Sequence, residues 1–503
     1  MRGMTLINIA NACNGRLHLY NPSVEDGTVT AATSVVIDSR KIEKGGIFVA
    51  TRGERVDGHS FIPKVWDEGA LCVICEEELS ESKFVPAGIH GNYIVVEDSF
   101  KALRDIAEYY RNLLDITVVG VTGSVGKTST KEMIAAVLSQ KFKVQKTQGN
   151  FNNEVGLPIT IFSIRDEHEV AVLEMGISDF GEMNRLGRMA KPDHCVITNI
   201  GPCHLEFLGD LDGVLKAKTE IFNNRNKDGD IILNGNDERL RTVTNVDGTC
   251  PMFFGSCHTE LEKRAQKGDP EAIVETGSYR LDVYATDIVS FGLEGTACMI
   301  HTPKGDFPVR IPLPGTHMVD NALAATAVGL AMGMEIGEIR DGIAKVEGLS
   351  GRSHLIHTSR FLLVDDCYNA NPKAMRAAID LIGNANGRKV AILGDMFELG
   401  EDSAAMHASV GEYAKDKVDV LICCGALSKN MYEAAYTGSQ KTVWFETRDE
   451  LMDVLSMEMK RNMEEIDWTS EPSKEEQLLE MDDTILIKAS HGMGFEKIVE
   501  LLS

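Results

Sequence analysis

Several features are scarce in this chain of 503 residues, and each scarcity excludes a class of protein. No apolar run approaches the roughly 18 residues that suggest a membrane-spanning helix. The segment Met1 to Asn11 is too short and too polar for the core of a signal peptide. The eleven cysteines have no metal-finger spacing, which predicts a reduced, cytoplasmic protein. Basic residues are also few, since 51 Lys and Arg oppose 76 Asp and Glu. The resulting net charge of −25 disfavours nucleic acid as a partner.

The length and the order of apolar runs predict the domain organisation. A chain of 503 residues exceeds what one hydrophobic core supports, so two to four domains are expected. Short strand-like runs come first, strand and helix patterns then alternate, and four more buried strand-like runs follow near the end. This order predicts an α/β protein with three domains. They are a small N-terminal α/β domain (1–108), a central domain with a mainly parallel sheet (109–347) and a C-terminal doubly wound domain (348–503).

Residues 116–132, ITVVGVTGSVGKTSTKE, carry the strongest functional signal. A helix is predicted from about Ser99 to Leu113, leading into this segment. The run Ile116–Val119 predicts a buried parallel strand, and a second helix is predicted from about Ser129 to Leu138. A glycine-rich loop between strand and helix wraps backbone N–H groups around phosphates. In the common phosphate-binding pattern, the P-loop, the first position is a glycine, whereas this chain has Val121 there. A plain glycine turn is therefore the alternative, which the flanking strand and helix disfavour. The predicted ATP-binding residues of the loop are Gly123, Ser124, Gly126, Lys127, Thr128 and Ser129.

Polar residues at the ends of later strand-like runs extend the candidate site. Glu174 ends VAVLEMG and His204 follows HCVITNIG, so both are expected at the edge where parallel strands end. A carboxylate there suits Mg²⁺, although a solvent-facing Glu and a structural His are the plain alternatives. Lys218 lies on a predicted helix, where a solvated lysine is usual. The candidate polar substrate contacts of TQGNFNNEVGLP, which could equally form a turn, are Asn150, Asn152 and Asn153.

Taken together, these segments resemble the Mur ligases, the ATP-dependent amide-forming enzymes of peptidoglycan precursor synthesis. The resemblance covers nearly the whole chain, from IDSR and VDGHSF through the glycine loop, LPGTHMVDNALAA and DDCYNANPKAM to KASHGMGFEKIV. The segments DDCYNANP and GDMFELG are the more specific ones. They resemble the family member that joins D-alanyl-D-alanine to a UDP-N-acetylmuramoyl-tripeptide through an acyl phosphate. The third residue of the tripeptide, meso-diaminopimelate or L-lysine, stays open.

The resemblance implies cofactors and residue roles. ATP and Mg²⁺ are the implied cofactors, with UDP-sugar binding in the N-terminal domain, ATP binding in the central domain and ligation in the C-terminal domain. The implied catalytic residues are Lys127, Glu174, His204 and a carbamylated Lys218. Thr128, Glu174, His204 and Lys218 are the implied Mg²⁺ ligands. Further ATP contacts are implied for His317, Asn321, Arg352 and Asp366. UDP-sugar contacts are implied for Asp38, Ser39, Arg40, Asp57 and His59.

Three other interpretations compete with this one. They are a related ligase that adds another amino acid, a P-loop NTPase that acts as a switch or motor, and an inactive paralogue. Lys127, Glu174 and Lys218 are all present, which argues against the inactive paralogue. A monomer is expected. Two charged stretches, Ser256–Ser278 and Ser456–Asp483, are expected to be surface insertions.

Overall fold

The computed structural model describes residues 1–20, 30–53, 56–85, 90–276, 280–383, 385–461 and 477–503. These residues form two compact units. The first unit consists of Met1–Gly255, Ile273–Tyr284 and Leu323–Gly342. The second consists of Ser256–Ala272, Ala285–Ala322 and Ile343–Ser503. Three α/β sheets follow one another along the chain, which confirms the predicted fold class. The boundaries at 108 and 347 stay predictions.

The first sheet is small and has helices on both faces. Its order is β1-β5-β4-β3-β2, with β1 (Arg16–His18) antiparallel to β5 (Tyr93–Val95) and parallel pairs among the others. The remaining strands are β2 (Val35–Val36), β3 (Ile47–Val49) and β4 (Cys72–Cys75). Helices α1 (Leu6–Ala12) and α4 (Ser99–Leu113) share one core with the sheet, and α3 (Ile62–Asp67) shares the other. Alternate residues of a strand point to opposite faces, so both faces are apolar.

The pair Cys72 and Cys75 has Cys-x-x-Cys spacing but forms part of these two cores. Cys72 packs in the core of α1 and α4, whereas Cys75 packs in the core of α3. Both thiols are buried and free, and burial raises the pKa of Cys75 to about 12. A buried thiol of high pKa is unreactive, so this spacing is a packing feature.

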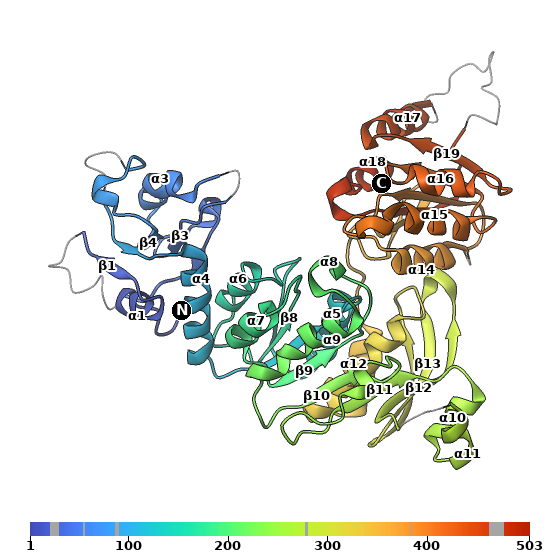
Figure 1. Cartoon of the computed structure of the whole chain (residues 1–503), viewed down its shortest axis with the longest axis horizontal. Helices are drawn as coiled ribbons and strands as arrows, with labels where there is room; N and C mark the ends of the chain where they lie inside the picture. Colours follow the sequence, from blue (N-terminus) through green and yellow to red (C-terminus); the bar gives the residue numbers. More distant parts are fainter. Residues whose placement is uncertain (21–29, 54–55, 86–89, 277–279, 384, 462–476) are drawn as a thin grey trace. The chain divides into compact units, whose positions relative to one another are not determined.

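Helix α4 joins the first sheet to the second within the first unit. Asp98 caps its start by accepting a hydrogen bond from the Lys101 backbone N–H (2.9 Å). Apolar residues at helical spacing bury one face, and the helix packs against α6 (Gly156–Phe162) and α7 (Glu182–Ala190), as Figure 1 shows. The predicted helix Ser99–Leu113 is confirmed with its bounds.

The second sheet has the order β14-β13-β12-β11-β10-β9-β6-β8-β7. Pairing is parallel from β7 to β11 and antiparallel between β13 and β14. The parallel strands are β6 (Thr117–Thr122), β7 (Val144–Lys146), β8 (Val170–Glu174), β9 (His194–Ile197), β10 (Ile231–Asn234) and β11 (Met252–Ser256). The others are β12 (Val283–Ser290), β13 (Thr296–Thr302) and β14 (Gly305–Ile311). The helices include α5 (Lys127–Leu138), α8 (Leu205–Leu208), α9 (Leu211–Thr219), α12 (Met318–Ala331) and α13 (Ile336–Ala344).

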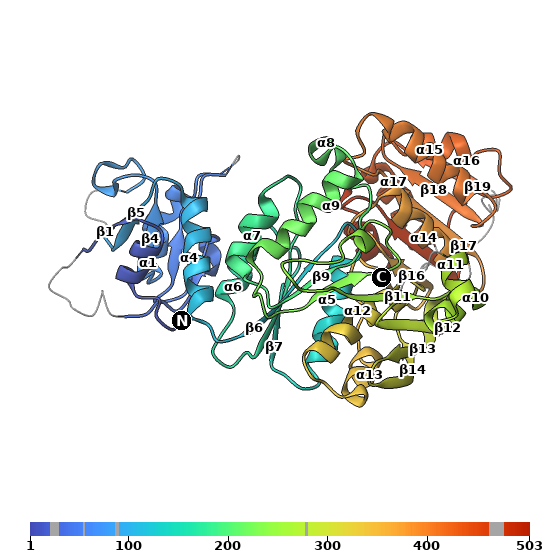
Figure 2. The same ribbon diagram turned by 60° about the horizontal axis from the view of Figure 1, so that its bottom comes forward.

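The third sheet is doubly wound, with the order β15-β16-β20-β17-β18-β19. Only β15 (His354–His357) is antiparallel to its neighbour β16 (Phe361–Asp365). The other strands are β17 (Lys389–Gly394), β18 (Val420–Cys424), β19 (Lys441–Phe445) and β20 (Asp483–Lys488). Its helices are α14 (Pro372–Gly383), α15 (Ser403–Ala414), α16 (Lys429–Ala435), α17 (Arg448–Arg461) and α18 (Glu496–Leu502). Figure 2 shows α15 and α16 beside β18 and β19.

The structure describes each of the two predicted insertions only in part. The first contains α10 (Glu260–Gln266) and α11 (Pro270–Thr276), in keeping with a surface insertion, and its last residues, 277–278, lie outside the described residues. Most of the second insertion, 462–476, also lies outside them. Over the part of the chain that the structure describes, no helix is both long and apolar enough to cross a membrane.

Candidate active site

The glycine loop connects β6 directly to α5, because α5 begins at Lys127, two residues before the predicted start. Gly126 precedes the helix with φ +84°, and Gly123 has φ +148°. A Cβ on Gly123 would lie 2.0 Å from Thr198 Oγ1, so only glycine fits there. The loop therefore has the close backbone path that phosphate binding needs.

Residues that follow β9 hold this loop in place. The backbone N–H groups of Ser124 and Val125 donate to Asn199 O and Asn199 Oδ1, both at 3.0 Å. Thr198 Oγ1 donates to Val125 O at 2.7 Å. Sequence analysis missed Thr198 and Asn199. Their position in TNIG, directly after a strand that pairs with β6, could have identified them.

Lys127 and Thr128 lie on the first turn of α5, where helix N–H groups carry partial positive charge. Lys127 Nζ donates to the carbonyl oxygens of Gly123 (2.9 Å) and Ser124 (3.4 Å), so its ammonium lies across the loop. Thr128 is buried, and Ser129 is half-buried. This cation and the backbone N–H groups at the helix start can bind a polyphosphate.

Glu174 ends β8, next to β6, and its side chain is 2% exposed. Asn152 Nδ2 donates to Glu174 Oε1 at 2.8 Å, and the Glu174 backbone N–H donates to Thr147 Oγ1 at 3.0 Å. Glu174 Oε2 is buried without a hydrogen-bond partner, and Lys131 Nζ lies 3.8 Å from it. A buried carboxylate oxygen without a hydrogen-bond partner is unusual, and a metal ion bound to it would supply the missing partner.

The three asparagines of the predicted substrate segment have different surroundings. Asn152 orients Glu174, as described above. Asn153 Oδ1 accepts the backbone N–H groups of Val155 (3.1 Å) and Gly156 (2.8 Å), so this side chain holds the turn that leads into α6. Asn150 is exposed. The structure therefore brings Asn152 together with Glu174 and gives Asn153 a local structural contact.

Lys218 and His204 lie in segments that follow β9. Lys218 is 1% exposed on α9. Burial first and the charge of Lys127 second lower the pKa of Lys218 to about 7. Cys203, which lies near Lys218 in space, donates its S–H to Ser124 Oγ at 3.2 Å. This contact brings the segment after β9 to the glycine loop. The adjacent His204 has φ +51°, a conformation that is uncommon for residues other than glycine, and such residues cluster at functional sites.

Four further predicted ATP contacts lie in the second unit. Asp366 pairs with Lys488 Nζ at 2.6 Å and accepts the Ser353 backbone N–H at 2.9 Å. The Arg352 guanidinium lies 4.1 Å from the centre of the Tyr368 ring. Asn321 Nδ2 donates to Met318 Sδ at 3.2 Å, and His317 is within electrostatic range of Asp366. Sequence analysis missed Lys488 and Tyr368, although both lie in segments that it had singled out.

The predicted UDP-sugar residues form two capped turns. Asp38 caps the 3₁₀ turn Ser39–Lys41 and binds the Arg40 guanidinium through Nε and Nη2, both at 2.9 Å. Hydrogen bonding to Arg40 lowers the pKa of Asp38 to about 2. Arg40 is 82% exposed and Ser39 is buried. The guanidinium is therefore accessible, with one edge occupied by Asp38.

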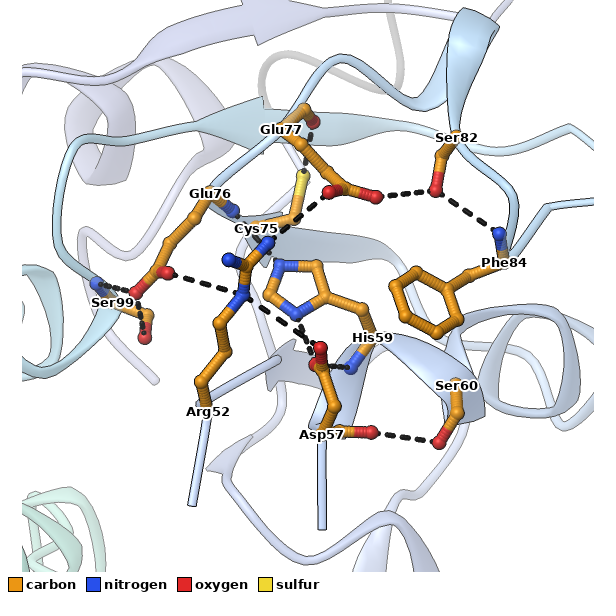
Figure 3. A network of polar contacts seen from close by, with 10 residues as sticks. All are labelled: Arg52, Asp57, His59, Ser60, Cys75, Glu76, Glu77, Ser82, Phe84 and Ser99. Carbon is orange, nitrogen blue, oxygen red and sulfur yellow. Dashed lines mark hydrogen bonds and ion pairs between the residues drawn. The ribbon is translucent and has the colours of Figure 1, made fainter. Parts of the chain in front are cut away.

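The second turn, around His59, is an internal network (Figure 3). His59 is fully buried, with Nδ1 2.7 Å from Asp57 Oδ1 and Nε2 accepting the Glu76 backbone N–H at 3.0 Å. Both ring nitrogens are occupied, so His59 can hold the turn but offers no nitrogen to a ligand. Arg52 lies near three carboxylates, at 3.7 Å from Asp57, 3.5 Å from Glu76 and 3.1 Å from Glu77.

Within the residues that the structure describes, no group of three or more His, Cys, Asp or Glu side chains could hold a metal ion. Mg²⁺ is usually held by one or two protein oxygens together with substrate phosphates. The orphan Oε2 of Glu174 and the Thr128 hydroxyl suit that kind of site.

Three family descriptions match successive parts of the chain. "Mur ligase family, catalytic domain" matches residues 32–111, "Mur ligase middle domain" matches 121–329, and "Mur ligase, glutamate ligase domain" matches 351–468. Two curated relatives share the name UDP-N-acetylmuramoyl-tripeptide–D-alanyl-D-alanine ligase. The Bacillus subtilis (strain 168) protein is 35% identical over 99% of this chain and 97% of its own length. The Escherichia coli (strain K12) protein is 31% identical over 100% and 99%.

Solved structures agree with the sequence comparisons. A crystal structure of MurF from Acinetobacter baumannii matches with a TM-score of 0.79 and 30% identity, covering 99% of this chain and 98% of that one. MurF from Thermotoga maritima in complex with ADP matches with a TM-score of 0.73 and 26% identity, covering 93% and 96%. Because the likeness to curated relatives extends over the whole length, the chain belongs to the Mur ligase family.

Proposed function

We propose that this chain is an ATP-dependent ligase that joins D-alanyl-D-alanine to a UDP-N-acetylmuramoyl-tripeptide. The observation that carries the proposal is the phosphate loop with the buried Glu174 at the end of the neighbouring strand. It occurs in a chain that matches relatives of that name over at least 99% of its length. The segment DDCYNANP, which contains Asp366 and Tyr368, supports this substrate pair over that of another Mur ligase.

The proposed reaction has two steps. The tripeptide carboxylate attacks the γ-phosphorus of ATP, and the bond to the bridging oxygen breaks. ADP departs, and an acyl phosphate is formed. The neutral amine of D-alanyl-D-alanine then attacks the acyl carbon, and phosphate and a proton leave as the amide forms. Lys127, whose ammonium lies across the glycine loop, is proposed to offset charge on the transferred phosphoryl group, as in other phosphoryl transfers.

We propose Thr128, Glu174 and His204 as the residues that hold Mg²⁺. A bound Mg²⁺ would neutralise phosphate charge. The support for Glu174 is its buried, unpaired Oε2. The support for Thr128 is its place at the helix start, beside Lys127.

A carbamate on Lys218 is the second part of the proposal. Only a neutral amine reacts with CO₂, forming a nitrogen–carbon bond and releasing one proton, and a pKa of about 7 leaves much of Lys218 neutral. The carbamate would reverse the charge of this buried side chain and let it orient a cation. Nuclear magnetic resonance with ¹³C-labelled bicarbonate would show a carbamate signal that is absent from Lys218→Ala. A spectrum without that signal would contradict the assignment.

The remaining proposed residue roles concern the binding of the UDP-sugar substrate and of ATP. We propose the first sheet for the UDP-sugar, with Arg40 and the turns of Asp38, Ser39, Asp57 and His59, and with Asn150, Asn152 and Asn153 at the substrate. His317, Asn321, Arg352 and Asp366 are proposed to contact ATP. The exposed, planar guanidinium of Arg40 suits phosphate or carboxylate recognition. We also propose a cytoplasmic monomer. Light scattering after gel filtration tests the monomer.

One assay tests the function. Phosphate release from ATP is measured with each UDP-tripeptide, with and without D-alanyl-D-alanine, and the product mass is recorded. We expect release that needs both substrates and a product that contains both. Release of phosphate from ATP alone at the same rate would instead support an NTPase that acts as a switch or motor. A product with another amino acid would support a related ligase.

A further inference from the structure

Lys131 is a fully buried lysine that the proposed reaction does not use. It lies one turn after Lys127 on α5 and is 1% exposed. Its Nζ donates to Thr147 O at 2.6 Å and lies 3.1 Å from Glu132 Oε1 and 3.8 Å from Glu174 Oε2. Burying an ammonium is costly unless it is paired and hydrogen-bonded, so these three partners account for its place.

The three contacts of Lys131 join three elements at the candidate metal ligand. Lys131 belongs to the phosphate-loop helix, Thr147 follows β7, and Glu174 ends β8. Thr147 is itself fully buried, and its Oγ1 accepts the Glu174 backbone N–H at 3.0 Å. Lys131 therefore reaches Glu174 twice, through Thr147 on the backbone and directly on the carboxylate.

We propose that Lys131 is a positioning residue that orients the Glu174 carboxylate for Mg²⁺. This inference rests on the proposed role of Glu174 as a metal ligand. Asn152 holds Oε1 by a hydrogen bond, while Lys131 attracts Oε2 from 3.8 Å, which is too long for a hydrogen bond. The carboxylate is thus fixed in rotation, and the lone pairs of Oε2 stay available to a metal ion.

Two effects of the Lys131 charge on a metal ion oppose each other. The ammonium repels a cation, and it also holds the ligand that binds the cation. Glu132 Oε1 lies at 3.1 Å, closer than Glu174, so the Lys131–Glu132 pair presents little net charge to the metal. The orienting effect should therefore exceed the repulsion. Groups that orient a metal ligand in this way typically change metal affinity by about 10–100-fold when they are removed.

The test measures Mn²⁺ binding to the full chain by electron paramagnetic resonance, in the presence of ADP. We expect Lys131→Met to weaken Mn²⁺ binding by about tenfold or more. ADP affinity without divalent metal should change little. Glu174→Gln should weaken Mn²⁺ binding as well. In the double variant K131M/E174Q, the two effects should not add, because Lys131 acts through Glu174.

Two further variants separate orientation from charge and from folding. Lys146→Met is the matched control, because Lys146 is half-exposed and pairs with the same Glu132 without an ion pair to Glu174. It should leave Mn²⁺ affinity unchanged. The variant K131M/E132Q removes the pair as a unit, keeps the net charge and provides a second test if K131M folds poorly. We expect the same weakening in this variant as in K131M.

The outcomes distinguish the two proposals. Weaker Mn²⁺ binding in E174Q together with unchanged or tighter binding in K131M and K131M/E132Q would overturn the role of Lys131 alone. Unchanged binding in E174Q would overturn the metal assignment of Glu174, and the role of Lys131 with it. Fully additive losses in K131M/E174Q would also overturn the proposal, because Lys131 would then act independently of Glu174.

Discussion

A methyl group added at Gly123 should impair phosphate binding by the glycine loop between β6 and α5 and leave the rest of the fold intact. The Cβ of Gly123→Ala would lie 2.0 Å from Thr198 Oγ1, whereas ordinary contacts begin at 3.4 Å, so the atoms must separate by about 1.4 Å. Thr198 cannot move by that distance and keep its 2.7 Å hydrogen bond to Val125 O. The alanine also needs a backbone φ of +148°, which side chains rarely adopt.

The size of the effect follows from these two costs. The backbone strain is about 1–3 kcal/mol. The lost hydrogen bond is worth about 0.5–1.5 kcal/mol. An unliganded loop can relax by moving, but phosphate binding needs the original path, so the cost should appear as lost affinity. At about 1.4 kcal/mol per tenfold, the loss in ADP affinity is roughly 10- to 1,000-fold.

Isothermal titration with ADP measures this loss, and thermal unfolding shows whether the variant is folded. Gly333→Ala is the matched control, because Gly333 also has positive φ (+69°) but a Cβ there would meet nothing within 4 Å. It should lower stability through strain and keep ADP affinity. An unchanged ADP affinity in Gly123→Ala, with a melting temperature like that of Gly333→Ala, would refute the reasoning.

Three other predictions concern charged residues of the site. Lys127→Ala should lower ligation by roughly 100-fold or more with normal thermal unfolding, and near wild-type turnover would contradict the phosphate-loop assignment. In buffer free of CO₂, Lys218→Met should raise the unfolding free energy by a few kcal/mol at pH 6 and by progressively less as the pH rises from about 7 to 10.5. The reason is that burial makes the charged lysine costly in the folded state only, which is also why its pKa is lowered to about 7. An equal gain in unfolding free energy at pH 6 and pH 10 would contradict this explanation. Arg40→Ala should raise KM for the UDP-tripeptide and spare KM for ATP, and a rise in KM for ATP alone would show that the substrates are assigned to the wrong domains.

Local sequence patterns were sufficient to predict several of the helices and strands and the glycine loop between β6 and α5. The strand, glycine loop and helix around Lys127 are contiguous, and the expected helix Ser99–Leu113 was found with its bounds. Periodicity and glycine chemistry are properties of neighbouring residues, so one sequence expresses them directly. The position of Glu174 at a strand end could be predicted for the same reason. Whole-chain likeness to Mur ligases then added the family and its activity.

The environment of each side chain was decided only by tertiary structure. Sequence cannot show that Lys218 is buried near Lys127, because the two are 91 positions apart. It also gave no sign that Lys131 reaches Glu174, or that Asn199 holds the glycine loop. Only the fold shows that the two ring nitrogens of His59 lie against Asp57 and Glu76, whereas its place in the UDP-sugar site stays a prediction. Burial and pairing depend on which strands become neighbours, and that order is a property of the whole sheet.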